Sequence, residues 1–171
     1  MKYLFTADWH LGHDNIIQYC KRPFCDVTDM AEEFVRRYTE VVEPGDTVYF
    51  LGDTVWKKEA GDLYLPRLKG NKIHVTGGHD HRYFKQTNCP IVHFHPKGEP
   101  ELYLCHYPLL TWPGWEHDVR HLHGHQHGNG ARRAEALDVG VDVWNFYPVE
   151  LAKVMEYFQN PANFFEIKNQ A

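Results

Sequence analysis

The sequence predicts an α/β protein built around a mixed sheet, and two observations lead to this class. Three apolar runs in the first half of the chain, at residues 2–7, 47–51 and 72–76, have the composition of buried strands, with helical periodicity between the first two. Later, residues 91–94 and 101–105 are short apolar runs joined by a turn rich in proline and glycine, which is typical of a hairpin. Strands that alternate with helices early and form hairpins later indicate both parallel and antiparallel neighbours.

The remaining elements follow from the same kinds of pattern. A helix of roughly 13 residues begins near Thr28 or Asp29, either of which can cap it, with Glu32 as the capping-box partner. A second helix, over residues 59–69, carries Pro66 in its middle, which disfavours helix there. Further helices are predicted at residues 15–20, 81–85 and 148–159, further strands at residues 119–123, 137–143 and 164–167, and an irregular loop at residues 109–115.

Composition indicates a single globular domain spanning residues 1–171, with 43% hydrophobic and 15% aromatic residues. The formal net charge of -5 argues against long duplex nucleic acid as the main partner, because counterion release requires a basic face. A small phosphorylated ligand held through metal ions is compatible with this charge. The 13 histidines are the unusual feature, since borderline divalent metals routinely use imidazole ligands.

Cysteine usage and hydropathy indicate the compartment. No Cys-x-x-Cys pair occurs, so reduced thiols of a cytosolic protein are the expected state of Cys20, Cys25, Cys89 and Cys105. The chain reaches Asp8 without the apolar stretch of a signal peptide, and no run of about 18 apolar residues occurs anywhere. We therefore expect a cytoplasmic protein that does not span or bind a membrane.

Carboxylates and imidazoles recur at or just past the ends of predicted strands, where open α/β sheets place their sites. Taken alone, an Asp-x-His, a Gly-Asp or a His-x-His is more often a turn or a solvated surface group. Together they supply enough ligands for two divalent metal ions, and turns alone do not explain the whole set. The pieces, in order, are Asp8-Trp9-His10, Gly52-Asp53, Gly77-Gly78-His79-Asp80, His106 and Gly124-His125-Gln126-His127.

This order of motifs resembles the signature of the calcineurin-like metallophosphoesterases, D-x-H, G-D, G-N-H-[DE], H and G-H-x-H. The stretches at residues 12–17 and 139–145 look like the small single-domain bacterial and phage members. The resemblance implies a four-layer αββα fold, in which two mixed sheets form a sandwich flanked by helices. It also implies that Asp8, His10 and His127 bind one metal, that His106 and His125 bind a second, and that Asp53 bridges the two.

The resemblance further implies that His79 contacts the phosphate or protonates the leaving oxygen, with Asp80 orienting it. Gly78 departs from the pattern, because the family has an asparagine there whose amide binds the second metal and helps to position the phosphate. Glycine can do neither, so we expect the second metal to bind more weakly. The glycine can be natural or engineered. Shifting the alignment by one residue would misplace the pair formed by His79 and Asp80.

Other polar residues allow two interpretations. His13, Asn15 and Arg22 follow the first motif and would touch a substrate phosphate, or else form a solvated loop. His121 and His123 share a strand face with His125, which allows a supporting role at the site, although a structural role is the simpler interpretation. Trp112 and Trp115 and the remaining histidines, His74, His93, His95 and His117, are expected to pack or to be solvated.

The expected activity is hydrolysis of a phosphomonoester or phosphodiester by a hydroxide that bridges two divalent ions. Manganese is the first choice for these ions, with iron, zinc, nickel and cobalt as alternatives. The substrate is expected to be a small phosphorylated molecule, and a nucleotide or short oligonucleotide fits this description. Two alternatives stay open: a binding protein on a phosphoesterase scaffold weakened at Gly78, because a fold does not guarantee an activity, and a small nuclease.

Overall fold

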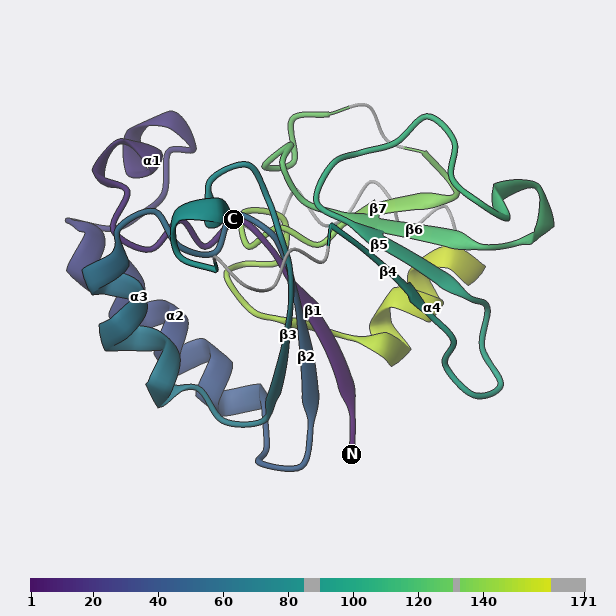
Figure 1. Ribbon diagram of the computed structural model, residues 1–171, viewed down its shortest axis with the longest axis horizontal. Coiled ribbons are helices and arrows are strands. Elements are labelled where there is room, and N and C mark those ends of the chain that lie inside the picture. Colours follow the sequence, from purple (N-terminus) through teal and green to yellow (C-terminus); the bar gives the residue numbers. More distant parts are fainter. Residues whose placement is uncertain (85–89, 131–132, 161–171) are drawn as a thin grey trace.

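The computed structural model describes residues 1–84, 90–130 and 133–160. Two four-stranded mixed sheets form the centre of the protein (Figure 1). The first has the order β3-β2-β1-β8, with β1, β2 and β3 parallel and β8 antiparallel to β1. The second has the order β4-β5-β6-β7, with β4 antiparallel to β5 and the other pairs parallel. The α/β class with mixed sheets is thus confirmed.

The strands agree with the predicted runs to within a few residues, and the short β8 is additional. Their bounds are β1 (Tyr3–Thr6), β2 (Thr47–Leu51), β3 (Asn71–Val75), β4 (Ile91–Phe94), β5 (Leu102–Cys105), β6 (Arg120–His123), β7 (Ala136–Asp138) and β8 (Val149–Glu150). β7 is shorter than the predicted strand at 137–143, because Gly140 pairs with Ala7 beyond β1 and a turn begins at Val141. The predicted edge strand at 164–167 lies outside the described residues.

The helices differ from prediction mainly at their ends. Their bounds are α1 (Asp14–Tyr19), α2 (Val27–Val41), α3 (Lys58–Tyr64) and α4 (Leu151–Gln159), with 3-10 turns η1 (Leu65–Arg67), η2 (Asp80–Arg82) and η3 (Trp115–His117). The cap predicted for α2 was wrong by two or three residues, because the carboxylate of Asp26 accepts hydrogen bonds from the backbone N–H groups of Thr28 and Asp29. The helix predicted at 59–69 ends at Tyr64, and Pro66 lies in the following 3-10 turn.

Alternation along the strands divides the core into layers. Leu4, Val48 and Phe50 of the first sheet pack against helices α1 to α3. Phe5, Tyr49 and Leu51 face the other way, and together with residues of the second sheet and of α4 they form the core between the sheets, whose second-sheet members are Phe94, Leu102, Leu104, Leu122 and Leu137. The two sheets therefore pack face to face, with helices on the outer face of the first.

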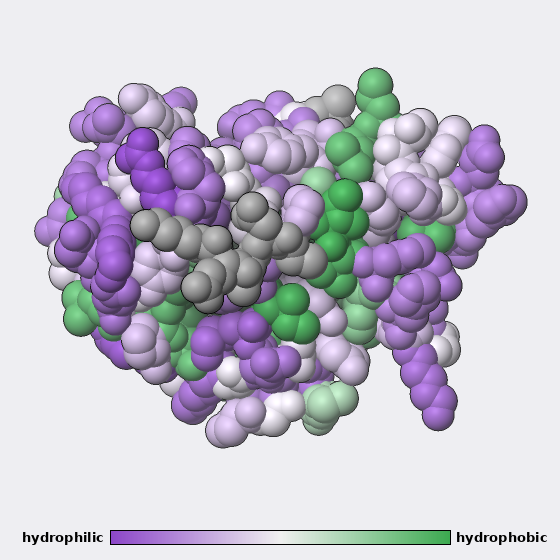
Figure 2. All heavy atoms as spheres, viewed as in Figure 1, coloured by the Kyte–Doolittle hydropathy of each residue, from purple (hydrophilic) through white to green (hydrophobic). Residues whose placement is uncertain are grey.

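The outer face of the second sheet is covered differently from the helical layer that the resemblance implies. Among the described residues, Trp112 and Val119 cover Tyr103 and Cys105 of β5. Proline at positions 108 and 113 keeps most of this covering segment irregular, as predicted. On the face seen in Figure 2, hydrophilic residues predominate over the helical half, and hydrophobic residues gather over the edge strand β4. No helix in the described ranges has the length and apolar character needed to cross a membrane.

Candidate metal centre

The six predicted metal ligands gather into two groups at the strand ends. In each group the candidate donor atoms all lie within 4.8 Å of one another. Asp8, His10 and His127 form the first group, and Asp53, His106 and His125 form the second. The structure therefore brings together every ligand predicted from the sequence, from loops that follow β1, β2, β5 and β6.

Asp53 lies between the two groups. Its Oδ2 is 3.3 Å from Nε2 of His106 in its own group and 3.8 Å from Nε2 of His10 in the other. The backbone N–H of His79 donates to its other oxygen, Oδ1, over 2.9 Å. One carboxylate thus faces both groups, which is the position that a residue shared by two cations must occupy.

The ligand loops join the two sheets. The backbone N–H of His125, which follows β6, donates to both carboxylate oxygens of Asp8, which follows β1, over 3.1 and 2.9 Å. The backbone N–H of Asp8 donates to the carbonyl of Gly52, and that of Gly124 donates to the carbonyl of His106. These hydrogen bonds set the spacing of the two groups through the backbone.

Five of the six ligands adopt an unusual backbone conformation. Non-glycine residues rarely have positive φ, because the Cβ atom crowds the following carbonyl. The five ligands with positive φ are Asp8 (61°), His10 (51°), Asp53 (50°), His125 (70°) and His127 (48°). Strained backbone of this kind concentrates at functional sites, where the surrounding structure holds it in place.

Two glycines allow the ligands to approach closely. A Cβ at Gly52, where φ is +88°, would lie 2.6 Å from Nδ1 of His106. A Cβ at Gly124 would lie 2.6 Å from Oδ2 of Asp8. Both positions therefore require glycine for the ligand beside them to keep its place.

The imidazoles present lone pairs toward the site. Nδ1 of His106 donates to the carbonyl oxygen of Leu51 over 2.9 Å, and Nδ1 of His127 donates to Oδ2 of Asp142 over 2.7 Å. In the neutral form each ring therefore carries its lone pair on Nε2. Nε2 of His106 and both ring nitrogens of His10 are buried, and they have no hydrogen-bond partner among the described residues. Buried polar atoms rarely remain unpaired, so these nitrogens fit a metal ion as their partner.

The electrostatics of the site also fit a cation. Burial raises the pKa of Asp8 to about 7, against the neighbouring charges of His127 and His106. Burial lowers the pKa of His10 to about 2, which keeps this imidazole neutral and able to bind a metal. Burial acts to raise the pKa of Asp53, but the neighbouring His106 outweighs it and holds that pKa below its ordinary value.

His127 is held by two residues that the sequence did not single out for this task. Burial acts to lower its pKa, but the hydrogen bond to Asp142 outweighs this effect and raises the pKa to about 10. Asp142 in turn accepts two hydrogen bonds of 2.7 Å from the guanidinium of Arg22. Carboxylates commonly orient metal-binding histidines in this way. Asp142 was missed because it lies in a stretch predicted as strand and meets its partner only in three dimensions.

The prediction that Arg22 contacts a substrate phosphate is wrong. Its side chain is fully buried, and its remaining donors reach the carbonyl oxygens of Asp8 and Trp9 and the sulfur of Met30. All five N–H donors of the guanidinium are therefore used inside the protein. Arg22 supports the first ligand loop instead of facing a ligand.

The role predicted for Asp80 also needs correction. Its Oδ1 accepts from the backbone N–H groups of Thr54 and Val55, and its Oδ2 accepts from that of Gly77. None of the hydrogen bonds found among the described residues joins Asp80 to the imidazole of His79. Asp80 therefore ties the loop after β2 to the loop after β3, and it does not orient His79 through the ring.

His79 itself lies at the opening of the site. Its side chain is 46% exposed, and its Nε2 is 3.7 Å from Oδ2 of Asp53. The ring of Trp56 packs beside it, with ring centroids 4.6 Å apart, and also contacts His13 at 4.0 Å. Trp56 was not predicted to be near the site, since nothing in its local sequence distinguishes it from a core residue.

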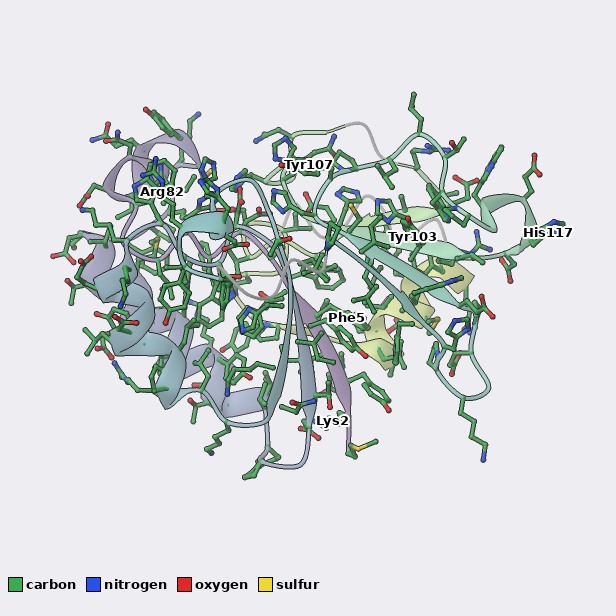
Figure 3. The ribbon with its side chains drawn as sticks, in the orientation of Figure 1. Lys2, Phe5, Arg82, Tyr103, Tyr107 and His117 are labelled. Carbon is green, nitrogen blue, oxygen red and sulfur yellow. The ribbon has the colours of Figure 1, made fainter. Side chains whose placement is uncertain are left out.

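The other predicted contacts divide between the site and its surroundings. His13 packs beside His10, and its Nδ1 caps α1 by accepting from the N–H of Ile16. Asn15 is exposed on α1 and makes no side-chain hydrogen bond among those found in the described residues. A Cβ built on Gly78 would lie 3.1 Å from the hydroxyl of Tyr107, whose ring packs against His106 and His125. Figure 3 shows Tyr107 in the upper part of the view, above the strands.

His121 and His123 lie on the outer face of the second sheet. Nδ1 of His121 lies 2.8 Å from the carbonyl of Tyr103, its ring packs against Trp112, and burial lowers its pKa to about 4. Nδ1 of His123 lies 2.9 Å from the carbonyl of Gly124. Both histidines therefore stabilise the structure behind the ligand loops, as the simpler interpretation predicted.

Comparison with known proteins supports the fold. No protein-family model matches the chain. The chain is 29% identical over 173 residues to an uncharacterised protein of Methanocaldococcus jannaschii, with 92% of each chain covered. Its structure is similar to the crystal structure of a protein of unknown function from Aquifex aeolicus, with a TM-score of 0.74, 24% identity and coverage of 91% of this chain and 98% of the other. An experimentally determined structure therefore shares this fold.

Proposed function

We propose that the protein is a metal-dependent phosphoesterase that hydrolyses phosphomonoesters or phosphodiesters at a dinuclear centre. The observation that carries the proposal is the position of Asp53 between two three-residue ligand groups. Asp8, His10 and His127 would hold one divalent ion, and His106 and His125 would hold the other, with Asp53 shared. Both groups mix imidazole and carboxylate donors, which suits manganese and other borderline divalent metals.

When bound, the two ions would supply Lewis acidity toward a phosphate group and would lower the pKa of a water molecule toward neutrality. The chain's own contribution is to fix the donors before any ligand arrives. Backbone hydrogen bonds place Asp8 and Asp53, and the acceptors at Leu51 and Asp142 set the ring nitrogen that His106 and His127 present. Such preorganisation reduces the cost of assembling the site when the substrate binds.

His79 is the residue proposed to donate a proton to the leaving oxygen. Its imidazole is half-exposed beside Asp53, so it can reach a substrate that binds over the ligand groups. Histidine is the side chain most often used for proton transfer near neutral pH. Trp56 packs against the ring of His79 and limits its movement. This contact would orient the ring in place of the contact expected from Asp80.

The resemblance to calcineurin-like metallophosphoesterases supports the same proposal. Four of its five motifs supply the six residues that meet in the two ligand groups. The two mixed sheets packed face to face are compatible with the family's fold. The second outer helical layer of that fold is the part that the described residues do not provide. Gly78 departs from the family pattern, because it offers no side chain to the second metal. The alternative to test is therefore a weakened enzyme or a binding protein.

Turnover of two synthetic esters tests the proposal. Metal-depleted protein would be supplied with manganese and assayed on nitrophenyl phosphate and bis-nitrophenyl phosphate, which report monoesterase and diesterase activity. We expect hydrolysis that requires the metal and that Asp53→Asn abolishes, whereas Asp62→Asn, at an exposed carboxylate on α3, leaves it intact. Metal binding without turnover of either ester would show that the chain is a binding protein.

A further inference from the structure

Metal-binding side chains also gather at the far end of β5 from His106. Antiparallel pairing sets His93 opposite Tyr103 and Phe94 opposite Leu102, so extending the register places His95 opposite Glu101. Side chains alternate along a strand, and Phe94 points into the core between the sheets. His93, His95 and Glu101 therefore share the opposite, outer face.

The carboxylate of Glu101 lies between the two imidazoles. Its Oε2 is 3.1 Å from Nε2 of His93, and its Oε1 is 2.9 Å from Nδ1 of His95. The two rings lie beside each other with centroids 4.5 Å apart. One donor atom from each of the three residues falls within 4.8 Å of the others, as in the two groups of the dinuclear centre.

The surroundings of this group favour a cation. His93 and Glu101 line an open cavity of about 490 Å³, which His117 and Asp118 also line. Glu99 contributes another carboxylate. Arg120 forms an ion pair with Asp118. Among the ion pairs found in the described residues, neither glutamate pairs with a lysine or an arginine, and Glu101 pairs only with His93 and His95. The cavity therefore combines imidazole with excess negative charge.

We propose that His93, His95 and Glu101 bind one zinc-class divalent ion. This third metal site is separate from the dinuclear centre. Two imidazoles and one carboxylate are a common protein donor set for zinc, and copper and nickel also bind imidazole readily. The fourth position is open to water or to His117 across the cavity. His106 lies five positions after Glu101, beyond the four residues of β5, which places these two residues about 16 Å apart along the extended chain.

The ion would connect the β4–β5 hairpin to the segment at residues 113–119 if His117 completes the site. Figure 3 shows His117 at the right-hand end of the molecule, away from Tyr107, whose ring packs against His106 and His125. The two sites therefore face different surroundings. All three proposed ligands are exposed, and they can be replaced without disturbing the core. The proposal does not depend on the phosphoesterase activity.

Zinc stoichiometry of the full chain tests the third site. Metal-depleted wild-type protein and Glu101→Gln would be titrated with zinc and analysed for bound metal. Glu99→Gln is the control, because Glu99 lines the same cavity and forms no ion pair with either imidazole among those found in the described residues. We expect Glu101→Gln to bind one zinc fewer, or to bind that zinc at least about tenfold more weakly, while Glu99→Gln matches the wild type. His95→Asn should reproduce the loss.

Two further readouts keep the result specific. The imidazole NMR signals of His93 and His95 should shift when zinc fills the site, including in Asp53→Asn, where the dinuclear centre is damaged. Manganese-dependent ester turnover should be the same in Glu101→Gln and the wild type. Equal zinc stoichiometry and affinity in wild type, Glu101→Gln and His95→Asn would overturn the third site, whether or not the protein proves to be a phosphoesterase.

Discussion

The space around Gly78 determines whether this position can accept an asparagine, the residue that the family pattern has here. Gly78 is not among the glycines with positive φ, so its backbone suits other residues. The nearest obstacle to a side chain is the hydroxyl of Tyr107, 3.1 Å from an ideal Cβ, and this ring is 43% exposed and able to move by a few tenths of an ångström. The steric objection to an asparagine at this position is therefore small.

Gly78→Asn should raise affinity for the second metal by about tenfold, because an amide oxygen would join Asp53, His106 and His125 as a fourth protein ligand. Turnover should rise most at low metal concentration. Manganese titration by calorimetry, with initial rates on nitrophenyl phosphate, measures both effects. Tyr107→Phe in the same background removes the hydroxyl that the asparagine meets. Unchanged affinity and rate in both backgrounds would mean that another ligand already fills this place.

His79→Gln should preserve metal content and lower kcat, by about 10²-fold or more for esters with basic leaving groups. The loss should be smaller for good leaving groups, since these depart without a proton. Rates on a series of aryl phosphates with different leaving-group pKa values measure this slope. A uniform loss across the series would indicate that His79 binds the phosphate without transferring a proton.

At the scale of elements, Asp80 connects the ends of two strands. It accepts three backbone hydrogen bonds, two from the loop after β2 and one from the loop after β3, and it is 1% exposed. Asp80→Asn replaces one acceptor oxygen by an NH₂ group, which leaves at least one buried N–H unpaired. The free energy of unfolding of the metal-free protein should fall by about 1–3 kcal/mol, as measured by urea denaturation.

Metal affinity should fall in the same variant, because Asp53 lies directly before the loop that Asp80 holds. Asp62→Asn is the matched control, since that carboxylate is exposed on α3. If Asp80→Asn were as stable as the control and bound metal equally well, the connection between the two loops would be unimportant.

The edge strand β3 carries a histidine that should make stability depend on pH. The ring of His74 stacks between Phe50 and Phe84, and burial lowers its pKa from 6.5 to about 4. The unfolded chain therefore binds the extra proton first as pH falls. The contribution of His74 to stability is complete above pH 6.5 and is lost as pH falls toward 4, by up to about 3 kcal/mol.

His74→Phe should remove this part of the pH dependence while keeping the stack. Urea denaturation of metal-free wild type and variant between pH 7 and 4 measures it, because contributions from other groups cancel in the difference. A difference in stability that stays constant across this range would contradict the assignment.

The elements and the site were predictable to different degrees. Continuous apolar runs predicted the strands because burial on both faces leaves a simple pattern, as at residues 47–51. Helix ends were less certain, since Asp26, Thr28 and Asp29 are all good caps and only the folded geometry selects Asp26. The gathering of the six candidate ligands was predictable because each of them follows a strand. The hydrogen bonds of Arg22 and Asp80 were not, because their partners are backbone groups and distant side chains.

At the scale of the whole molecule, the site lies where the two sheets are joined. Asp8 follows a strand of the first sheet, and its carboxylate binds the backbone of His125, 117 residues away, beyond the end of the second sheet. No periodicity in the sequence encodes the order of strands in either sheet or this contact between them. Each ligand group combines residues that follow strands of both sheets, so separating the sheets would split both groups. We therefore expect metal binding and folding of the whole chain to be coupled.

Anomalous diffraction from a crystal of the wild-type protein soaked in manganese tests the dinuclear centre most directly. We expect two manganese positions, one among Asp8, His10 and His127 and one among Asp53, His106 and His125, with Asp53 binding both ions. A distance of about 3.5–4 Å between the two ions is the value expected for a shared carboxylate. A single manganese position, or manganese bound only away from Asp53, would show that the protein has no dinuclear centre.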